Sequence, residues 1–245
     1  DNTQFDWAAY WNANVYDRAT IGGANPPTVV TASSYTSGAI TYTNVRRIAA
    51  TIQGAIDDSQ SGDTVLAQDG AYPENLVITR PISLLGNGAN VLAKGRAGPE
   101  SVIKPPLSVA AVDIQADNVT INGFTFDMAG LIPAWTITAS NKPGGGRFSG
   151  VQILYNHFQG NPAAAAQSDP GGAYLAKQDN LLVEGNFFDA LGSHAVYLAQ
   201  GSANAIYRQN DSVGNYLANL STHDLPHTNL LAESNRADSD AMLLH

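Results

Sequence analysis

Six seven-residue segments of this chain share one pattern of apolar residues and asparagine, and this repeat limits the possible folds more than any other feature. Their second and fourth positions are apolar, four have asparagine first, and five have asparagine seventh. The segments are 81-PISLLGN-87, 118-NVTINGF-124, 150-GVQILYN-156, 180-NLLVEGN-186, 204-NAIYRQN-210 and 229-NLLAESN-235. The segments begin 24 to 37 residues apart, and one short strand per repeat of about this length is typical of a parallel β-solenoid.

A second series of short apolar segments alternates with the first. It comprises 134-AWTIT-138, 173-AYLAK-177, 195-AVYLA-199, 215-NYLAN-219 and 241-AMLLH-245, with glycine-rich and polar turn sequences between the two series. The alternative, a doubly wound α/β fold, needs crossover helices, and no long segment with a period of 3.6 residues follows residue 60. We therefore predict an all-β protein, a right-handed single-stranded parallel β-helix, with handedness following the general bias of parallel crossovers.

The start of the chain differs from the repeats. Ile48, Ile52 and Ile56 recur at helical spacing, which predicts a short amphipathic helix covering the open N-terminal end of the solenoid. Residues 1–45 are rich in aromatic side chains, so we expect an N-terminal capping or docking segment there. The predicted organisation is residues 1–45 as that segment and residues 46–245 as the parallel β-helix.

Several phrases resemble the pectin-lyase-like superfamily of right-handed parallel β-helix proteins. The run 51-TIQGAIDDSQSGDTVLAQDGAYPENLVITRPISLLGNG-88 looks like the opening of such proteins, with its short helix, "GDTV" and "I-x-L-x-G". The phrases 118-NVTINGFTF-126 and 194-HAVYLAQGSAN-204 look like later coils. The resemblance covers about residues 46–245 and implies the fold. The superfamily includes lyases, epimerases, esterases and non-catalytic surface proteins, so it does not specify an activity.

Residues in the same position of successive coils should form columns on the outside of the solenoid. The third-position column ends in Leu182, Ile206 and Leu231, an apolar stripe that we expect another segment or subunit to cover. The fifth-position column ends in Glu184, Arg208 and Glu233, which predicts a ladder of alternating charge, either a surface salt-bridge column or a site for an acidic sugar.

In the second series, Tyr174, Tyr197 and Tyr216 are expected in one exposed stack, as a carbohydrate or protein-interface platform or as simple cross-strand packing.

The seventh-position asparagines predict a structural ladder. Stacked amides can hydrogen-bond from one coil to the next and satisfy the backbone of a bend. We expect this ladder to contain Asn87, Asn156, Asn186, Asn210 and Asn235.

Catalytic residues are harder to specify. The superfamily's uronate-active enzymes would need a base near groups that neutralise the uronate, and Lys177, His194, Arg208 and Asp179 could supply such a site. No spacing demands this arrangement. We expect no cofactor and no metal, with calcium at Asp238 and Asp240 as the alternative.

Composition restricts the partners. The net charge of −9 argues against nucleic acid or anionic membrane as the main partner, and the absence of cysteine excludes disulfides and thiol catalysis. No apolar run is long enough to span a membrane. Because residues 241–245 read as a further strand, we expect contact with other copies of the chain or further β-helix coils.

These features lead us to expect an extracellular or cell-surface, non-catalytic β-helix module of a filament or adhesin-like assembly, contacting polysaccharide. The alternative is a polysaccharide lyase or epimerase acting on uronate-containing glycans.

Overall fold

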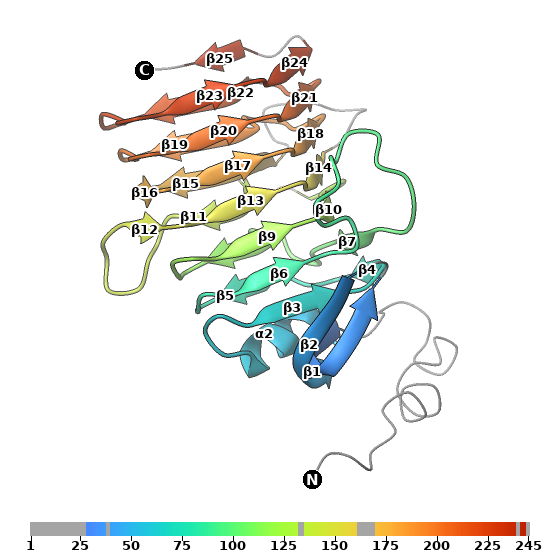
Figure 1. The fold of residues 1–245 in the computed structure, drawn as a ribbon. Coiled ribbons are helices and arrows are strands. Elements are labelled where there is room, and N and C mark those ends of the chain that lie inside the picture. The colour runs from blue at the N-terminus through green and yellow to red at the C-terminus, as the bar shows by residue number, and fades with distance from the viewer. Residues whose placement is uncertain (1–27, 38–39, 132–134, 161–169, 239–240, 244–245) are drawn as a thin grey trace, which may run out of the picture.

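The computed structural model describes residues 28–37, 40–131, 135–160, 170–238 and 241–243. It confirms a parallel β-helix, in which each coil contributes one strand to each of three sheets (Figure 1). Sheet A contains β3 (Thr64–Ala67), β6 (Ser83–Leu85), β9 (Thr120–Asn122), β13 (Gln152–Leu154), β17 (Leu182–Glu184), β20 (Ile206–Arg208) and β23 (Leu231–Glu233).

Sheets B and C also take one strand from each coil, stacked in the order of the chain. Sheet B contains β4 (Gly70–Tyr72), β7 (Ser101–Ile103), β10 (Phe124–Asp127), β14 (His157–Gln159), β18 (Phe187–Asp189), β21 (Asp211–Val213) and β24 (Arg236–Asp238). Sheet C contains β5 (Leu76–Ile78), β8 (Val112–Ile114), β11 (Trp135–Ala139), β15 (Gly171–Ala176), β19 (Val196–Ala199), β22 (Ala218–His223) and β25 (Ala241–Leu243). A small sheet D pairs β12 (Phe148–Ser149) with β16 (Gln178–Asp179).

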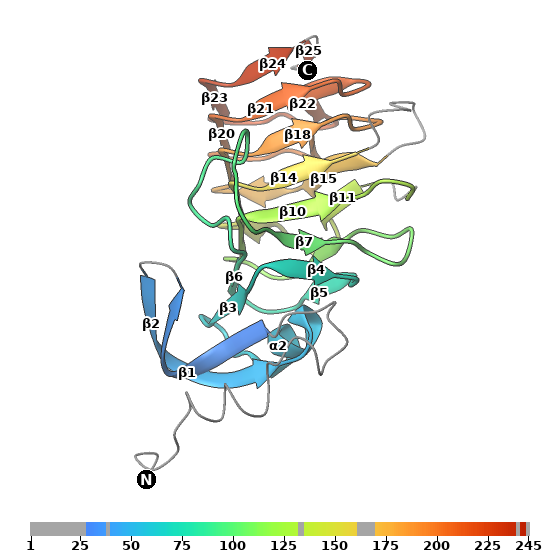
Figure 2. The same ribbon diagram turned by 90° about the vertical axis from the view of Figure 1, so that its right-hand side faces the viewer.

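The coil is right-handed. In Figure 1 the strands of sheet A run from left to right across the front, and those of sheet C return from right to left at the back, while the chain rises. Sheet B joins the two along the side that faces the viewer in Figure 2.

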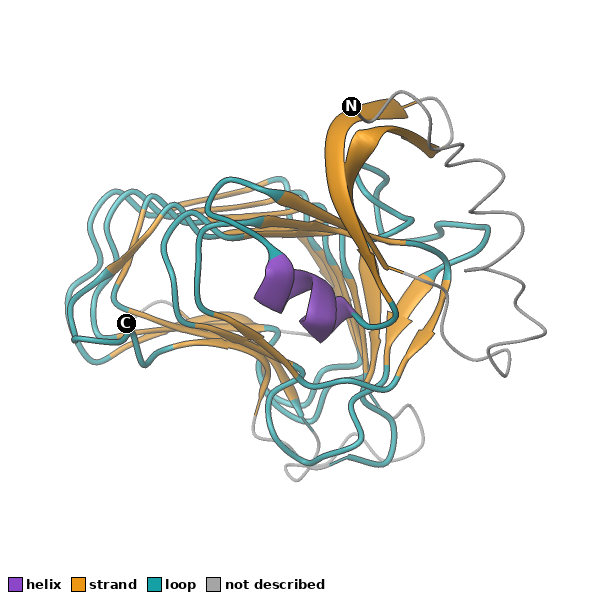
Figure 3. Ribbon diagram, turned by 90° about the horizontal axis from the view of Figure 1, so that it is seen from below, coloured by secondary structure: helices purple, strands orange, loops and turns teal. Residues whose placement is uncertain are grey.

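A helix and a hairpin cover the N-terminal end of the solenoid. Helix α2 (Ile52–Asp58) lies across the open end of the first coil, where Ile52 and Ile56 enter the core (Figure 3). The hairpin of β1 (Thr28–Ser37) and β2 (Ile40–Ala49) extends sheet A by antiparallel pairing of β1 with β3. The predicted helix therefore exists but begins after Ile48, which lies in β2. The prediction was wrong for Ile48, because residues 48, 52 and 56 have the spacing of one helix face although only the last two belong to the helix.

The core consists of the inward residues of the three sheets. Aliphatic side chains at the second and fourth positions of the repeat are buried, for example Leu181 and Val183. Phenylalanines of sheet B stack along the axis, with 5.2 Å between the ring centroids of Phe126 and Phe158 and 4.6 Å between those of Phe158 and Phe188. The stack and the aliphatic columns join successive coils into one continuous core.

Asparagine ladders mark both ends of the sheet A strands. Asn156, Asn186, Asn210 and Asn235 form a continuous ladder. The amide oxygens of the last three each accept the backbone N–H of the asparagine one coil earlier, at 2.9–3.0 Å, and that of Asn156 accepts the N–H of Phe124. Their Nδ2 groups donate to strand carbonyls. Asn87 does not join this ladder: its side chain is exposed and donates to Pro99. The reason is that Phe124, with no amide, occupies the ladder position between Asn87 and Asn156.

The first-position asparagines have a different role. Asn118, Asn180, Asn204 and Asn229 have φ between 51° and 54°, the left-handed region that asparagine tolerates better than other residues with side chains. Each therefore turns the chain into sheet A. Asn229 also donates to Asn204, and Asn204 to Asn180, so these side chains form a second, exposed ladder.

The predicted columns of sheet A are confirmed, whereas two of the strand registers expected in sheet C are wrong, one at Tyr216 and one at Trp135. Leu182 pairs with Ile206, and Ile206 with Leu231, as expected. In sheet C, however, Tyr197 pairs with Ser221 rather than with Tyr216. Tyr216 lies in the turn before β22, beside Leu191, and the neighbouring Leu217 is exposed rather than in the core.

Candidate functional site

The outer face of sheet C carries an aromatic cluster. Trp135 lies at the start of β11, and Tyr174 and Tyr197 stand opposite each other in β15 and β19. The ring centroid of Trp135 is 5.5 Å from that of Tyr174 and 5.6 Å from that of Tyr197, and the two tyrosines are 5.5 Å apart. All three side chains are partly exposed. Together with His194 and His223 they form what we call the aromatic platform.

Two histidines extend the aromatic platform. His194 lies 6.1 Å from Trp135 and 5.2 Å from Tyr197, and His223 stacks on Tyr197 at 4.7 Å, with an interplanar angle of 8°. Burial, and then the proximity of His223, lower the pKa of His194. A neutral imidazole has one donor and one acceptor nitrogen, and Nδ1 of His194 lies 3.2 Å from the hydroxyl of Ser193, which leaves Nε2 for a further partner.

Polar groups border the aromatic platform. Thr138, paired with Tyr174 in the sheet, donates to Asp113 at 2.9 Å. Burial, followed by the nearby Asp224, raises the pKa of Tyr197, so its hydroxyl stays protonated and can donate. The arrangement combines aromatic rings with fixed donors and acceptors, as a site for a hydroxylated ring requires.

The platform differs from the sequence prediction in its membership. Tyr174 and Tyr197 belong to it, but Tyr216 does not, for the register reason given above. Trp135 pairs with Gly171, three residues away from the alignment expected for 134-AWTIT-138, and still packs across both tyrosines. His223 lies at the end of β22 and was not predicted, because no local motif marks it.

The four residues considered for catalysis do not come together in the structure. Asp179 in sheet D accepts hydrogen bonds from Nε and Nη2 of Arg147, at 2.7 Å each. Arg208 in sheet A binds Glu184.

The remaining two catalytic candidates also lie apart. His194 belongs to the aromatic platform at the entrance to β19, and Lys177 lies in the turn after β15, beside Ala199. Lys177 and Asp179 are therefore neighbours at one corner, whereas His194 and Arg208 lie elsewhere, and Asp179 and Arg208 are already paired with other charged groups.

The apolar stripe and the charge ladder lie on the outer face of sheet A. Leu182 and Ile206 are partly buried, and Leu231 is 45% exposed. Arg208 donates to Glu184 at 2.8 and 2.9 Å and stands opposite Glu233 in the next strand. The Arg208 side chain is 38% exposed and that of Glu184 12% exposed.

No group of three or more histidine, aspartate or glutamate side chains able to hold a metal occurs among the described residues. Asp240, one of the two residues considered for calcium, lies outside them, and Asp238 faces Arg236 at 3.3 Å. Within the same described part of the chain, no helix is long and apolar enough to cross a membrane. Comparison with the models of known protein families, with curated proteins and with solved structures finds no match for this chain.

Proposed function

We propose that this chain is a non-catalytic β-helix module that binds polysaccharide through its aromatic platform. The observation that carries the proposal is the convergence of Trp135, Tyr174 and Tyr197 on the outer face of sheet C, with their ring centroids within 5.6 Å of one another. Aromatic rings bury the apolar faces of sugar rings, and neighbouring hydroxyl and imidazole groups can then bind sugar hydroxyls. Three rings from three coils offer a surface longer than a single sugar.

The charge of the chain favours a neutral glycan. Its net charge of −9 would repel a polyanion at long range. The charged groups bordering the aromatic platform are acidic, namely Asp113 and Asp224, and act in the same direction. His194 does not offset them at neutral pH, because its lowered pKa keeps the ring uncharged.

The biological setting of the module is part of the proposal. The resemblance to the pectin-lyase-like superfamily and the proposed affinity for polysaccharide support a place at the cell surface or outside the cell. The apolar stripe Leu182, Ile206 and Leu231 supports assembly with further copies or coils. The lyase or epimerase alternative has weaker support, since Asp179 is paired with Arg147, and Arg208, on sheet A, is paired with Glu184.

A screen with immobilised polysaccharides tests the proposal. The intact chain is passed over neutral glycans and over pectate and alginate, and the ultraviolet absorbance of unsaturated products is followed in parallel. We expect retention on a neutral glycan without product formation. Unsaturated product from pectate or alginate would establish the lyase alternative, and absence of retention on every glycan would refute the proposal.

A further inference from the structure

A second candidate site lies away from the aromatic platform, at the corner between sheets A and B. An open pocket of about 350 Å³ is bounded there by Leu92, Lys94, Gly185, Asn186, Gln209, Asp211 and Ser234. One wall is formed by residues from three successive coils. The other wall belongs to residues 88–100, the connection between β6 and β7, which we call the strap. Figure 2 shows the strap rising beside sheet B.

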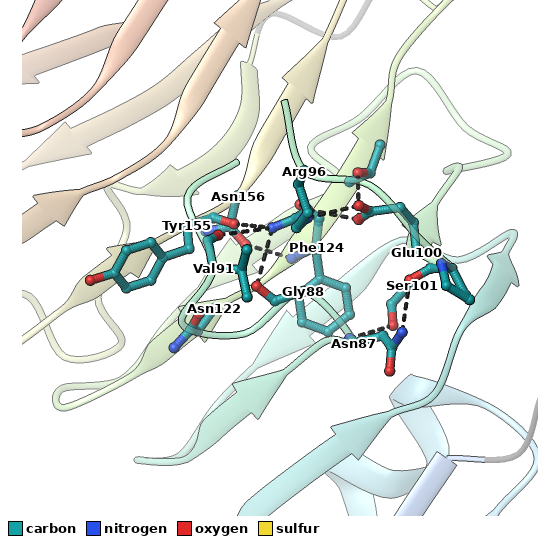
Figure 4. A network of polar contacts seen from close by, with 12 residues as sticks. Asn87, Gly88, Val91, Arg96, Glu100, Ser101, Asn122, Phe124, Tyr155 and Asn156 are labelled. Atoms are coloured by element: carbon teal, nitrogen blue, oxygen red, sulfur yellow. Dashed lines mark hydrogen bonds and ion pairs between the residues drawn. The ribbon is translucent and has the colours of Figure 1, made fainter. Parts of the chain in front are cut away.

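A buried network fixes the strap in place (Figure 4). The Arg96 side chain is only 5% exposed and forms an ion pair with Glu100 at 2.7 Å. It also donates to the carbonyls of Tyr155 at 2.6 Å and Gly88 at 3.2 Å. A charge this deeply buried is tolerated because its donors are hydrogen-bonded. The strap is therefore a rigid wall, which avoids the entropy cost of ordering a loop when a ligand binds.

Further along the strap, two contacts set the opening of the pocket. The backbone of Ala93 donates to Gly185 at 3.3 Å, which brings the strap to the corner of the fourth repeat segment. Lys94 pairs with Asp211 at 2.7 Å and lies over the ring of Phe187 at 5.6 Å. Both charged side chains keep contact with solvent, being 35% and 26% exposed. Leu92, at 55% exposure, adds an apolar edge.

The chemistry of the pocket selects its ligand. The single cation and the single carboxylate among the lining residues neutralise each other, so neither an anion nor a cation finds an unpaired opposite charge. Donors and acceptors remain on the ion pair, Gln209 and Ser234, and Leu92 supplies one apolar contact. A neutral ring bearing several hydroxyl groups matches this combination, and the volume suits a ligand of that size.

We propose that this corner pocket is a second glycan site, which takes one neutral hexose unit. Because the aromatic platform lies on sheet C and the pocket at the corner of sheets A and B, one chain would hold glycan on two separate faces. The module would then link polysaccharide chains rather than only adhere to one, with the gain in avidity that two sites give. The linking role rests on the proposed function of the aromatic platform, whereas binding at the pocket does not.

Titration with glucose, galactose and mannose, followed by the backbone amide signals in nuclear magnetic resonance, tests this assignment. At least one hexose should shift the signals of Gly185, Gln209 and Ser234 in the intact chain. Lys94→Met and Gln209→Ala should each weaken this response about tenfold or more. Lys104→Met is the matched control, because Lys104 also pairs with an aspartate of sheet B, at 2.8 Å, but does not line the pocket.

The outcomes separate the two sites. If no hexose shifts the three pocket signals, the second site is refuted even when a glycan binds the aromatic platform. If the pocket responds while the platform signals remain unchanged with every glycan, the pocket stands and the function proposed for the platform fails. Equal responses in Lys94→Met, Gln209→Ala and the wild type would also contradict the assignment.

Discussion

Replacing Asn186 by alanine should destabilise the protein strongly, and far more than replacing Asn235 or Asn87. Asn186 is 1% exposed. Its amide oxygen accepts the backbone N–H of Asn156 at 2.9 Å, and its Nδ2 donates to Ile153 at 2.8 Å and to Asn210 at 3.0 Å. Alanine leaves the buried N–H of Asn156 without a partner and removes the two donated bonds.

The magnitude follows from these contacts. A buried amide left unpaired costs about 1–3 kcal/mol, and each lost hydrogen bond a further net 0.5–1.5 kcal/mol or so, which gives about 2–6 kcal/mol in total. Unfolding in urea, extrapolated to water, measures this free energy. Because coils stabilise one another mainly through their neighbours, loss at Asn186 should also loosen the coils that contain Asn156 and Asn210.

Two other asparagines provide graded controls. Asn235 is partly exposed, so water can replace its side chain, and Asn235→Ala should cost about 1 kcal/mol. Asn87 lies outside the ladder on the surface, and Asn87→Ala should stay within about 0.5 kcal/mol of the wild type. The reasoning is refuted if Asn186→Ala costs no more than Asn87→Ala.

The remaining predictions concern pH and backbone geometry. Burial lowers the pKa of His157, so unfolding takes up a proton and stability should fall as the pH drops below about 6.5 toward the folded-state pKa. His157→Phe should reduce the dependence of the unfolding free energy on pH by up to about 1.4 kcal/mol per pH unit, as measured by urea unfolding. An unchanged pH dependence would contradict this prediction. Gly123 and Gly145 have φ of 81° and 75°, but a side chain at Gly123 would overlap the backbone of the strap, whereas Gly145 faces open space. Gly123→Ala should therefore lower the unfolding free energy by about 2 kcal/mol more than Gly145→Ala. Equal losses of stability in the two variants would show that the strap moves aside to make room for the methyl group.

The regular part of the fold was predictable because each coil repeats the same physical requirement. Every strand of sheet A needs two inward apolar residues, and the bend after it needs a side-chain amide to accept its backbone N–H. The sequence therefore repeats both features. Asn186 and Asn210 are 24 residues apart, and the same spacing gives the correct register of sheet C, because Ser221, the partner of Tyr197, is 24 residues after it. The prediction instead aligned Tyr216 and Leu217 with Tyr197 and Leu198, because the two pairs have the same residues, and this alignment does not keep the spacing.

The candidate sites were less predictable because they depend on contacts between coils of unequal length. Trp135 reaches Tyr174 and Tyr197 across two coils, and His223 joins them because it lies two residues after Ser221, the partner of Tyr197 in β22. The strap has no repeat at all. Its position depends on Arg96 finding the carbonyls of Gly88 and Tyr155, which no local pattern records.

The central claim is that the aromatic platform binds glycan, and the dissociation constant of one neutral glycan for three proteins tests it most directly. These are the wild type, Tyr197→Leu, which keeps apolar packing but removes the ring, and Tyr216→Leu, a tyrosine that is 49% exposed and outside the platform. We expect Tyr197→Leu to raise the dissociation constant about tenfold or more, and Tyr216→Leu to leave it unchanged. Equal weakening by both substitutions, or by neither, would contradict the account.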